Sequence, residues 1–179
     1  MKKYILGILV LSALFIACNN KEEAKTDGTK EGSAKLPYEA QYSTDFNNNV
    51  SDADLLTVLN SYKYWETGDM KGLRSTMGDS ITVQGADGFR FKGATDSLLK
   101  IWTAFRNDSL SAVKITMDVW LKNHNNKDST DFINVWYKEI DTYKSGKVDS
   151  ANWEDDNAMK DGKIVWYSQH RQLLAKEKK

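Results

Sequence analysis

The sequence is poor in the residues that build disulfide and metal-bound frameworks. Its 179 residues include one cysteine, Cys18, and two histidines, His124 and His170. A single thiol excludes an internal disulfide and a cysteine metal site. Two histidines this far apart, with no clustered acids beside them, give no metal signature. We therefore expect no metal and no cofactor, and we expect stability to come from packing.

The sequence also has little net charge and no long apolar run. Lys and Arg number 25, and Asp and Glu also number 25. No basic patch stands out, so nucleic acid is not an expected partner. The apolar run at residues 4–17 is shorter than the roughly 20 residues that a membrane-spanning helix needs. A phosphate-cradling glycine loop and a Gly-x-Ser-x-Gly elbow are both missing, so neither of those catalytic motifs applies.

The apolar run ends at the only cysteine. Lys2 and Lys3 precede it and the small residue Ala17 closes it, which is typical of a secretory signal peptide over residues 1–17. The residues Leu-Phe-Ile-Ala-Cys18 resemble the lipobox of bacterial lipoproteins. This resemblance implies that the Cys18 thiol receives a diacylglycerol and becomes the new N-terminus. The alternative is a conventional signal peptide in which Cys18 has no special role.

Residues 18–49 are expected to form the lipidated start and a flexible tether, because the stretch after Cys18 is mostly charged, small or polar. Its residues 21–23, Lys-Glu-Glu, resemble the export signal of surface lipoproteins in the Bacteroidetes, although a charged linker of no special meaning would look the same. We expect the protein on the bacterial outer membrane, anchored by lipid, and facing either the periplasm or the outside.

Residues 50–179 are expected to form a single domain. Helical apolar spacing predicts one helix after the capping residue Ser51, a short one after Asp69 and a third from Thr95, with a hairpin between the second and third. From residue 113 onward the period changes to two, and polar turns divide four strands. The helices must cover the apolar face of that sheet. We therefore predict an α+β fold, a cone-shaped curved antiparallel sheet wrapped around three N-terminal helices.

Several short motifs in this order resemble the nuclear transport factor 2-like superfamily, in particular its SnoaL-like branch. They are Glu66-Thr67-Gly68-Asp69, Asp87-Gly88, Phe91-Lys92-Gly93, the helix that carries Trp102, and Lys160-Asp161-Gly162-Lys163-Ile164. The resemblance implies a pocket between the helices and the concave sheet, and frequent dimers through the outer sheet face. It implies no single activity, because members include isomerases, cyclases, dehydratases and non-catalytic binding domains.

Catalytic relatives imply an Asp or a His in the cone as general base. His170 shares a strand face with Trp166 and Ser168 and could project into the cone, although a structural or exposed histidine is the simpler interpretation. Asp118 alternates with the apolar row from Val113 to Leu121, which places it on the opposite, outer face. His124 lies in a polar turn, where we expect it to be solvated.

The remaining predictions concern aromatic and acidic residues. Trp65, Trp102, Met117 and Trp136 are the expected ligand-binding pocket. Trp120 is expected on the outer face of its strand, which with the two-sided apolar strand after residue 129 predicts a homodimer through the convex face. The acidic run at residues 154–156 is expected to be a solvated bulge or strand edge, with calcium binding as the alternative.

Three functions remain open from the sequence. The first is a lipid-anchored, non-catalytic module that binds a small apolar ligand or a partner. The second is an isomerase- or cyclase-type enzyme with His170 as base. The third is a purely structural envelope component, in which the cone would be filled with side chains.

Overall fold

The computed structural model describes residues 37–173. The chain divides into two units at Glu39, and every helix and strand described here belongs to the unit that begins at Ala40. Within the described range, no helix combines the length and the apolar character needed to cross a membrane. The predicted signal peptide, the lipidation at Cys18 and residues 18–36 of the predicted tether lie outside the described residues.

The three predicted helices are present, and local capping explains where they begin. Helix α1 (Asp52–Thr67) begins where the Ser51 side chain accepts a hydrogen bond from the Asp54 backbone N–H, and it ends at Gly68, whose φ is 75°. Helix α2 (Met70–Ser75) is capped by Asp69, which accepts from the Gly72 N–H. Helix α3 spans Thr95–Ser109. Gly68 is suited to the end of α1, because a left-handed residue after a helix favours glycine, which has no Cβ to clash.

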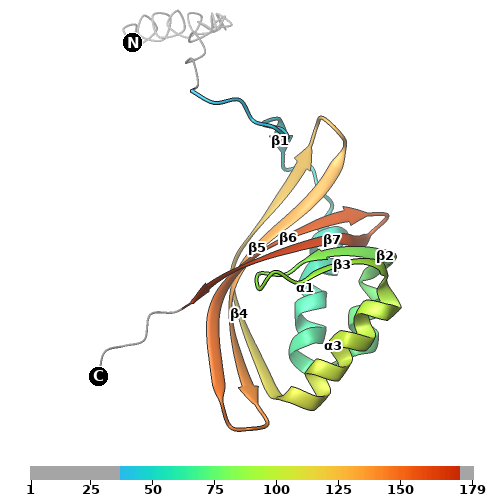
Figure 1. Cartoon of the computed structure of the whole chain (residues 1–179). Coiled ribbons are helices and arrows are strands. Elements are labelled where there is room, and N and C mark those ends of the chain that lie inside the picture. Colours follow the sequence, from blue (N-terminus) through green and yellow to red (C-terminus); the bar gives the residue numbers. More distant parts are fainter. Residues whose placement is uncertain (1–36, 174–179) are drawn as a thin grey trace, which may run out of the picture. The chain divides into compact units, whose positions relative to one another are not determined.

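The strands form one sheet that curls around α1 and α3 (Figure 1). Its order is β1-β4-β5-β6-β7-β2-β3, with the strands at Phe46–Asn47, Met77–Gln84, Arg90–Ala94, Leu110–Asn125, Thr130–Tyr143, Val148–Lys160 and Lys163–Leu173 for β1 to β7. The predicted cone-shaped α+β fold is thus confirmed. The sheet is mixed, because β2 pairs with β7 in parallel while the meander from β4 to β7 is antiparallel. Strand β1 lies in the predicted tether and pairs with β4.

The predicted apolar row of β4 is interrupted by a register shift between Met117 and Val119. Before the shift, Met117 lies opposite Tyr137, whose side chain is buried. After it, Trp120 lies opposite the buried Val135, so Val119 and Leu121 face the other way. The predicted continuous buried row is therefore wrong beyond Met117. The position predicted for Trp120 is also wrong, because one extra residue in a strand exchanges its two faces.

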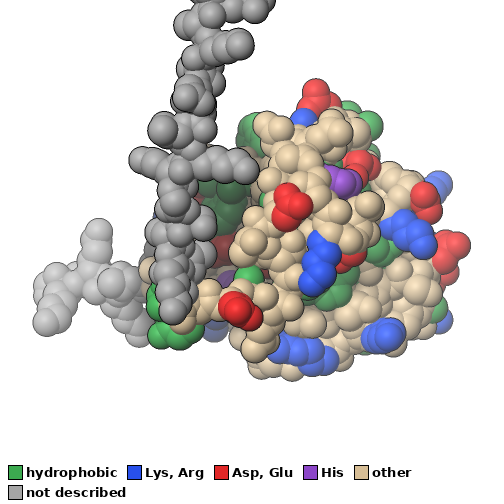
Figure 2. All heavy atoms as spheres, turned by 90° about the horizontal axis from the view of Figure 1, so that it is seen from above, with side chains coloured by type: hydrophobic (Ala, Val, Ile, Leu, Met, Phe, Trp, Pro, Cys, Tyr) green, Lys and Arg blue, Asp and Glu red, His purple; other side chains and the backbone are tan. Residues whose placement is uncertain are grey.

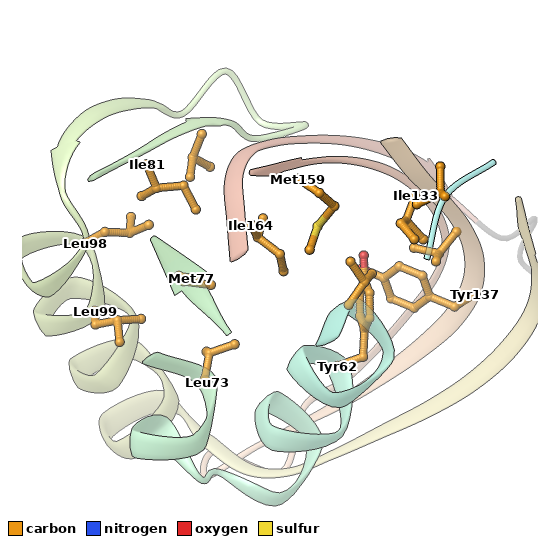
Figure 3. Close-up of a cluster of buried hydrophobic side chains, with 14 residues drawn as sticks. Tyr62, Leu73, Met77, Ile81, Leu98, Leu99, Ile133, Tyr137, Met159 and Ile164 are labelled. Atoms are coloured by element: carbon orange, nitrogen blue, oxygen red, sulfur yellow. The ribbon is translucent and has the colours of Figure 1, made fainter. Parts of the chain in front are cut away.

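The core lies between the helices and the concave face of the sheet. Figure 3 shows Leu73, Leu98 and Leu99 from the helices around a cluster that continues through Ile164 to Tyr137. Burial of these side chains holds the helices inside the sheet, since each fully buried aliphatic residue contributes on the order of 2 kcal/mol. On the face seen in Figure 2, acidic and basic side chains are interspersed and neither sign forms a single patch.

Candidate functional site: a cavity inside the cone

A cavity of about 700 Å³ lies inside the cone. The helices, β2, the inner faces of β5, β6 and β7, and the turn between β2 and β3 all contribute to its wall. Its aromatic lining includes Tyr62, Trp65, Trp102, Tyr137, Trp153 and Tyr167. The cone is therefore not filled by its own side chains, as the purely structural function would have required.

The tryptophans and one tyrosine form a connected wall. The ring centres of Trp65 and Trp102 are 6.4 Å apart in an edge-to-face arrangement, and those of Trp102 and Tyr167 are 6.3 Å apart in the same geometry. Such contacts stabilise aromatic pairs beyond the burial of their surface. Because the three rings come from α1, α3 and β7, they also link the helices to the sheet. This wall is held in place before any ligand arrives.

A buried carboxyl group, that of Asp155 on β6, lies behind the cavity wall. Its Oδ2 atom accepts hydrogen bonds from the hydroxyls of Tyr62, Tyr137 and Tyr167, each at 2.9 Å. Asn157 donates to the Tyr62 hydroxyl at 3.3 Å, and Gln169 donates to that of Tyr137 at 3.1 Å. The other carboxyl oxygen, Oδ1, is buried without a hydrogen-bond partner. One oxygen of Asp155 is thus saturated with donors while the other has none.

Burial shifts the protonation of this network. It raises the pKa of Asp155 to about 7, although the three tyrosine hydrogen bonds act in the opposite direction. Burial, followed by the charge of Asp155, also raises the pKa values of Tyr62 and Tyr137 well above their ordinary value. The carboxyl group therefore changes charge near neutral pH, while the tyrosines remain hydroxyl donors.

A pair of acidic residues on β5 lines the cavity. Glu139 and Asp141 lie two residues apart on the inner face, in line with Tyr137. Burial, then the negative charges of Asp141 and Asp155, raises the pKa of Glu139 to about 8, while a hydrogen bond from Trp65 acts against this shift. Burial also raises the pKa of Asp141. At pH 7, Glu139 therefore holds a proton beside the Asp141 carboxyl group.

Two of the four residues expected to form the pocket line the cavity, and the other two do not. Trp65 and Trp102 line the cavity. Met117 packs against the core cluster but does not line the cavity. Trp136 lies opposite Val119 and Glu154, which are exposed on the convex side, so its predicted position in the pocket is wrong. The inner residues of β5 are Val135 and Tyr137, on either side of Trp136.

Neither histidine faces the cavity. His170 is exposed and lies opposite Glu154, whereas its neighbours Gln169 and Arg171 line the cavity. The possible projection of His170 into the cone is therefore wrong, and the simpler interpretation of an exposed histidine holds. Its face of β7 is the convex one that also carries Trp166. His124 is not simply solvated, since its Nδ1 lies 2.5 Å from Asp131 Oδ1. Asp118 is exposed at the register shift of β4 and does not line the cavity.

Sequence reasoning missed Asp155, Glu139 and Asp141. Asp155 was expected to be solvated because acids flank it on both sides, yet it is the inner residue of that run. The alternation of β6 contained the signal, because Trp153, Asp155 and Asn157 share one face of the strand. Among residues 37–173, no group of three or more His, Cys, Asp or Glu side chains is placed to hold a metal ion.

Comparison with known proteins adds information on the fold. No protein-family model matches the sequence, and no curated protein sequence matches it either. Among solved structures, an NTF2-like protein of unknown function from Burkholderia pseudomallei aligns with a TM-score of 0.54 at 15% identity, over 69% of this chain and 92% of that one. An LEH-like epoxide hydrolase of M. tuberculosis aligns with a TM-score of 0.58 at 8% identity, over 68% and 84%.

A ketosteroid isomerase-like protein from Erwinia carotovora atroseptica aligns with a TM-score of 0.55 at 11% identity, over 70% of this chain and 98% of that one. Identities this low carry the fold and not the activity. The helices packed in the hollow of a curled sheet, and the agreement with these structures, lead to one conclusion: the chain has the nuclear transport factor 2-like fold.

Proposed function

We propose that this protein is a lipid-anchored component of the bacterial cell envelope whose cone binds a small, largely apolar ligand. The cavity of about 700 Å³ and its aromatic wall carry the proposal. Ligand sites are typically hollows of roughly 300–1,000 Å³, mostly apolar and with a few placed polar groups. The acids Glu139 and Asp141 are those polar groups, and Asp155 lies behind the wall, where it accepts hydrogen bonds from the tyrosines that line the cavity.

The anchor is proposed from the sequence alone. The lipobox-like residues that end at Cys18 support attachment to the outer membrane, and the charged stretch behind them supports a domain held away from the lipid.

A homodimer through the convex sheet face is part of the proposal. Val119 and Leu121 are 45% and 50% exposed on that face, and Trp136 lies beside them. A hollow of about 630 Å³ on the same face is lined by Phe46, Phe132 and other residues. Large apolar side chains that gather on one exposed face favour a protein partner. In a two-fold symmetric dimer, the convex faces of the two copies would contact each other and bury these side chains.

An acid–base enzyme is the second candidate function, and the cavity acids favour it over a histidine mechanism. Glu139 and Asp155 have pKa values raised to about 8 and about 7, close to the operating pH of a general acid or base. In that case Glu139, which lines the cavity, would exchange the proton with the substrate, and His170 would play no part.

Native mass spectrometry of the full chain, purified from its own cells, tests the binding function. We expect a co-purified small molecule on the protein. The substitution Ala86→Trp at the cavity wall should remove it, because the added ring occupies the cavity. Ala112→Trp is the matched control, because Ala112 is exposed on β4 and does not line the cavity. Equal occupancy in both variants would contradict binding inside the cone.

A further inference from the structure

We infer that the ligand of this cavity is an organic cation, an amine or ammonium compound with an apolar body, whose positive charge lies against Glu139 and Asp141. The inference rests on the proposed function, namely that the cone binds a small ligand. Three features of the described residues carry it: the charge balance of the wall, an unpartnered buried acceptor, and the aromatic lining.

The wall of the cavity has an excess of acid. In the described part of the chain, its lining residues include one base, Arg171, and four carboxylic acids, Asp87, Glu139, Asp141 and Asp149. Arg171 is already bound to Asp149 at 2.7 Å. Within residues 37–173 neither Glu139 nor Asp141 forms a salt bridge. Buried acids are ordinarily paired, so this pair lacks a cation that a ligand can supply.

The other arginine that acts on the acid pair, Arg106, forms its hydrogen bonds elsewhere. Arg106 on α3 donates to the backbone carbonyl oxygens of Trp65 and Glu66, at 3.3 Å each. Its charge acts on Asp141 from outside the cavity lining, and the pKa of Asp141 remains raised. The protein's own cations therefore leave the acid pair uncompensated.

The acid pair contains a buried acceptor without a hydrogen-bond partner. Asp141 lines the cavity, and its Oδ1 atom is buried without a donor. An unpaired buried acceptor costs free energy that a donor would recover. The cavity wall therefore favours a ligand that donates a hydrogen bond as well as a positive charge.

The aromatic lining favours a cation over a neutral donor. Ring faces attract positive charge through their quadrupole. The wall already shows this preference, because the Arg171 guanidinium lies 5.3 Å from the ring centre of Trp153. Trp65, which lines the cavity, also acts to lower the pKa of Glu139 and so favours its carboxylate. A ligand ammonium beside Glu139 would therefore lie next to an aromatic ring as well as an acid.

The protonation of Glu139 gives the inference a pH signature. Charged and hydrogen-bonding groups on several elements act on Glu139 and Asp141, which also act on each other. The other groups are Asp149 and Asp155 of β6, Arg171 of β7, Arg106 of α3 and Trp65 of α1. Together with burial they keep Glu139 protonated at pH 7. A bound cation favours the carboxylate, so binding at pH 7 should release a proton, and affinity should rise from pH 7 to 9.

Three probes with one skeleton separate charge from shape: 4-phenylbutylamine, 4-phenylbutan-1-ol and 4-phenylbutyrate. Their binding to the full chain is measured by isothermal titration calorimetry in two buffers of different ionisation enthalpy, which also counts released protons. We expect the amine to bind about tenfold more tightly than the alcohol, as a charge-assisted contact does. We expect the carboxylate to bind most weakly.

The variant Glu139→Gln should lower the affinity of the amine toward that of the alcohol and abolish proton release, with alcohol binding unchanged. Glu154→Gln is the matched control, because Glu154 is exposed on the convex face of β6. The comparison of the three probes needs no variant, so a misfolded Glu139→Gln would not weaken the test. Alcohol or carboxylate binding as tightly as the amine would overturn the cation while leaving ligand binding intact. Failure of all three probes to bind would overturn the proposed function and the inference together.

Discussion

Replacing Asp155 by asparagine should change how stability depends on pH. The pKa of Asp155 is about 7 in the folded chain, against about 3.9 for an unperturbed aspartate. Between these two values the folded state holds a proton that the unfolded state has released. The free energy of unfolding therefore falls as pH rises through this window, and the loss ends above pH 7.

The size of the effect follows from the two pKa values. Between pH 5 and pH 8, titration of Asp155 should remove about 2.5 kcal/mol of stability. An asparagine side chain cannot ionise, so the variant should avoid this loss. The substitution should cost about 1 kcal/mol at pH 5, because an amide disturbs the three tyrosine hydrogen bonds. The negative charge of Asp155 also raises the pKa of Glu139. Removing that charge lowers the pKa of Glu139, which further reduces the loss of stability as pH rises.

Urea unfolding followed by tryptophan fluorescence at pH 5, 6, 7 and 8 measures this difference. The variant should be the less stable protein at pH 5 and the more stable one at pH 8, so the two curves cross. Asp118→Asn, at an exposed position of β4, is the control and should follow the unaltered chain. Parallel curves for Asp155→Asn and the unaltered chain would refute the buried, proton-holding carboxyl group.

Two further predictions concern the anchor and the convex face. Cells labelled with radioactive palmitate should yield a labelled product, and Cys18→Ala should lose the label and leave the membrane fraction; label retained in the variant would place the lipid elsewhere. Light scattering should show a dimer that Leu121→Asp converts to monomer, whereas Leu56→Asp, at an exposed position of α1, should not; a strict monomer at high concentration would count against the dimer.

The helices and the meander could be predicted because each depends on local patterns. Ser51 and Asp69 begin helices through their own side chains, and Gly68 ends one through its freedom at positive φ. The parallel pairing of β2 with β7 could not be predicted, because these strands are far apart in sequence and nothing local selects the partner. The same holds for β1, whose two residues are too few to show a period.

The site was harder to predict than the fold. Trp65 and Trp102 were found because apolar spacing on a helix identifies its inner face. Trp136 was placed on the wrong face, because a strand that is apolar on both sides does not say which side is inside. Asp155 was misread because acids are usually exposed, and only its partners Tyr62, Tyr137 and Tyr167 make its burial tolerable.

The extra residue at Asp118 has a consequence for how this sequence encodes two surfaces at once. An unbroken alternation of apolar residues along β4 supplies the interior with Val113, Ile115 and Met117, and then supplies the exterior with Val119 and Leu121. The phase change also turns Lys122 inward, where it bonds to Asp52 at the start of α1. If the same residues paired without this extra residue, Val119 would lie opposite Val135, and the two halves would form one apolar row on the concave face. A single extra residue can thus place one alternating row of apolar side chains first on the concave face of the sheet and then on the convex one.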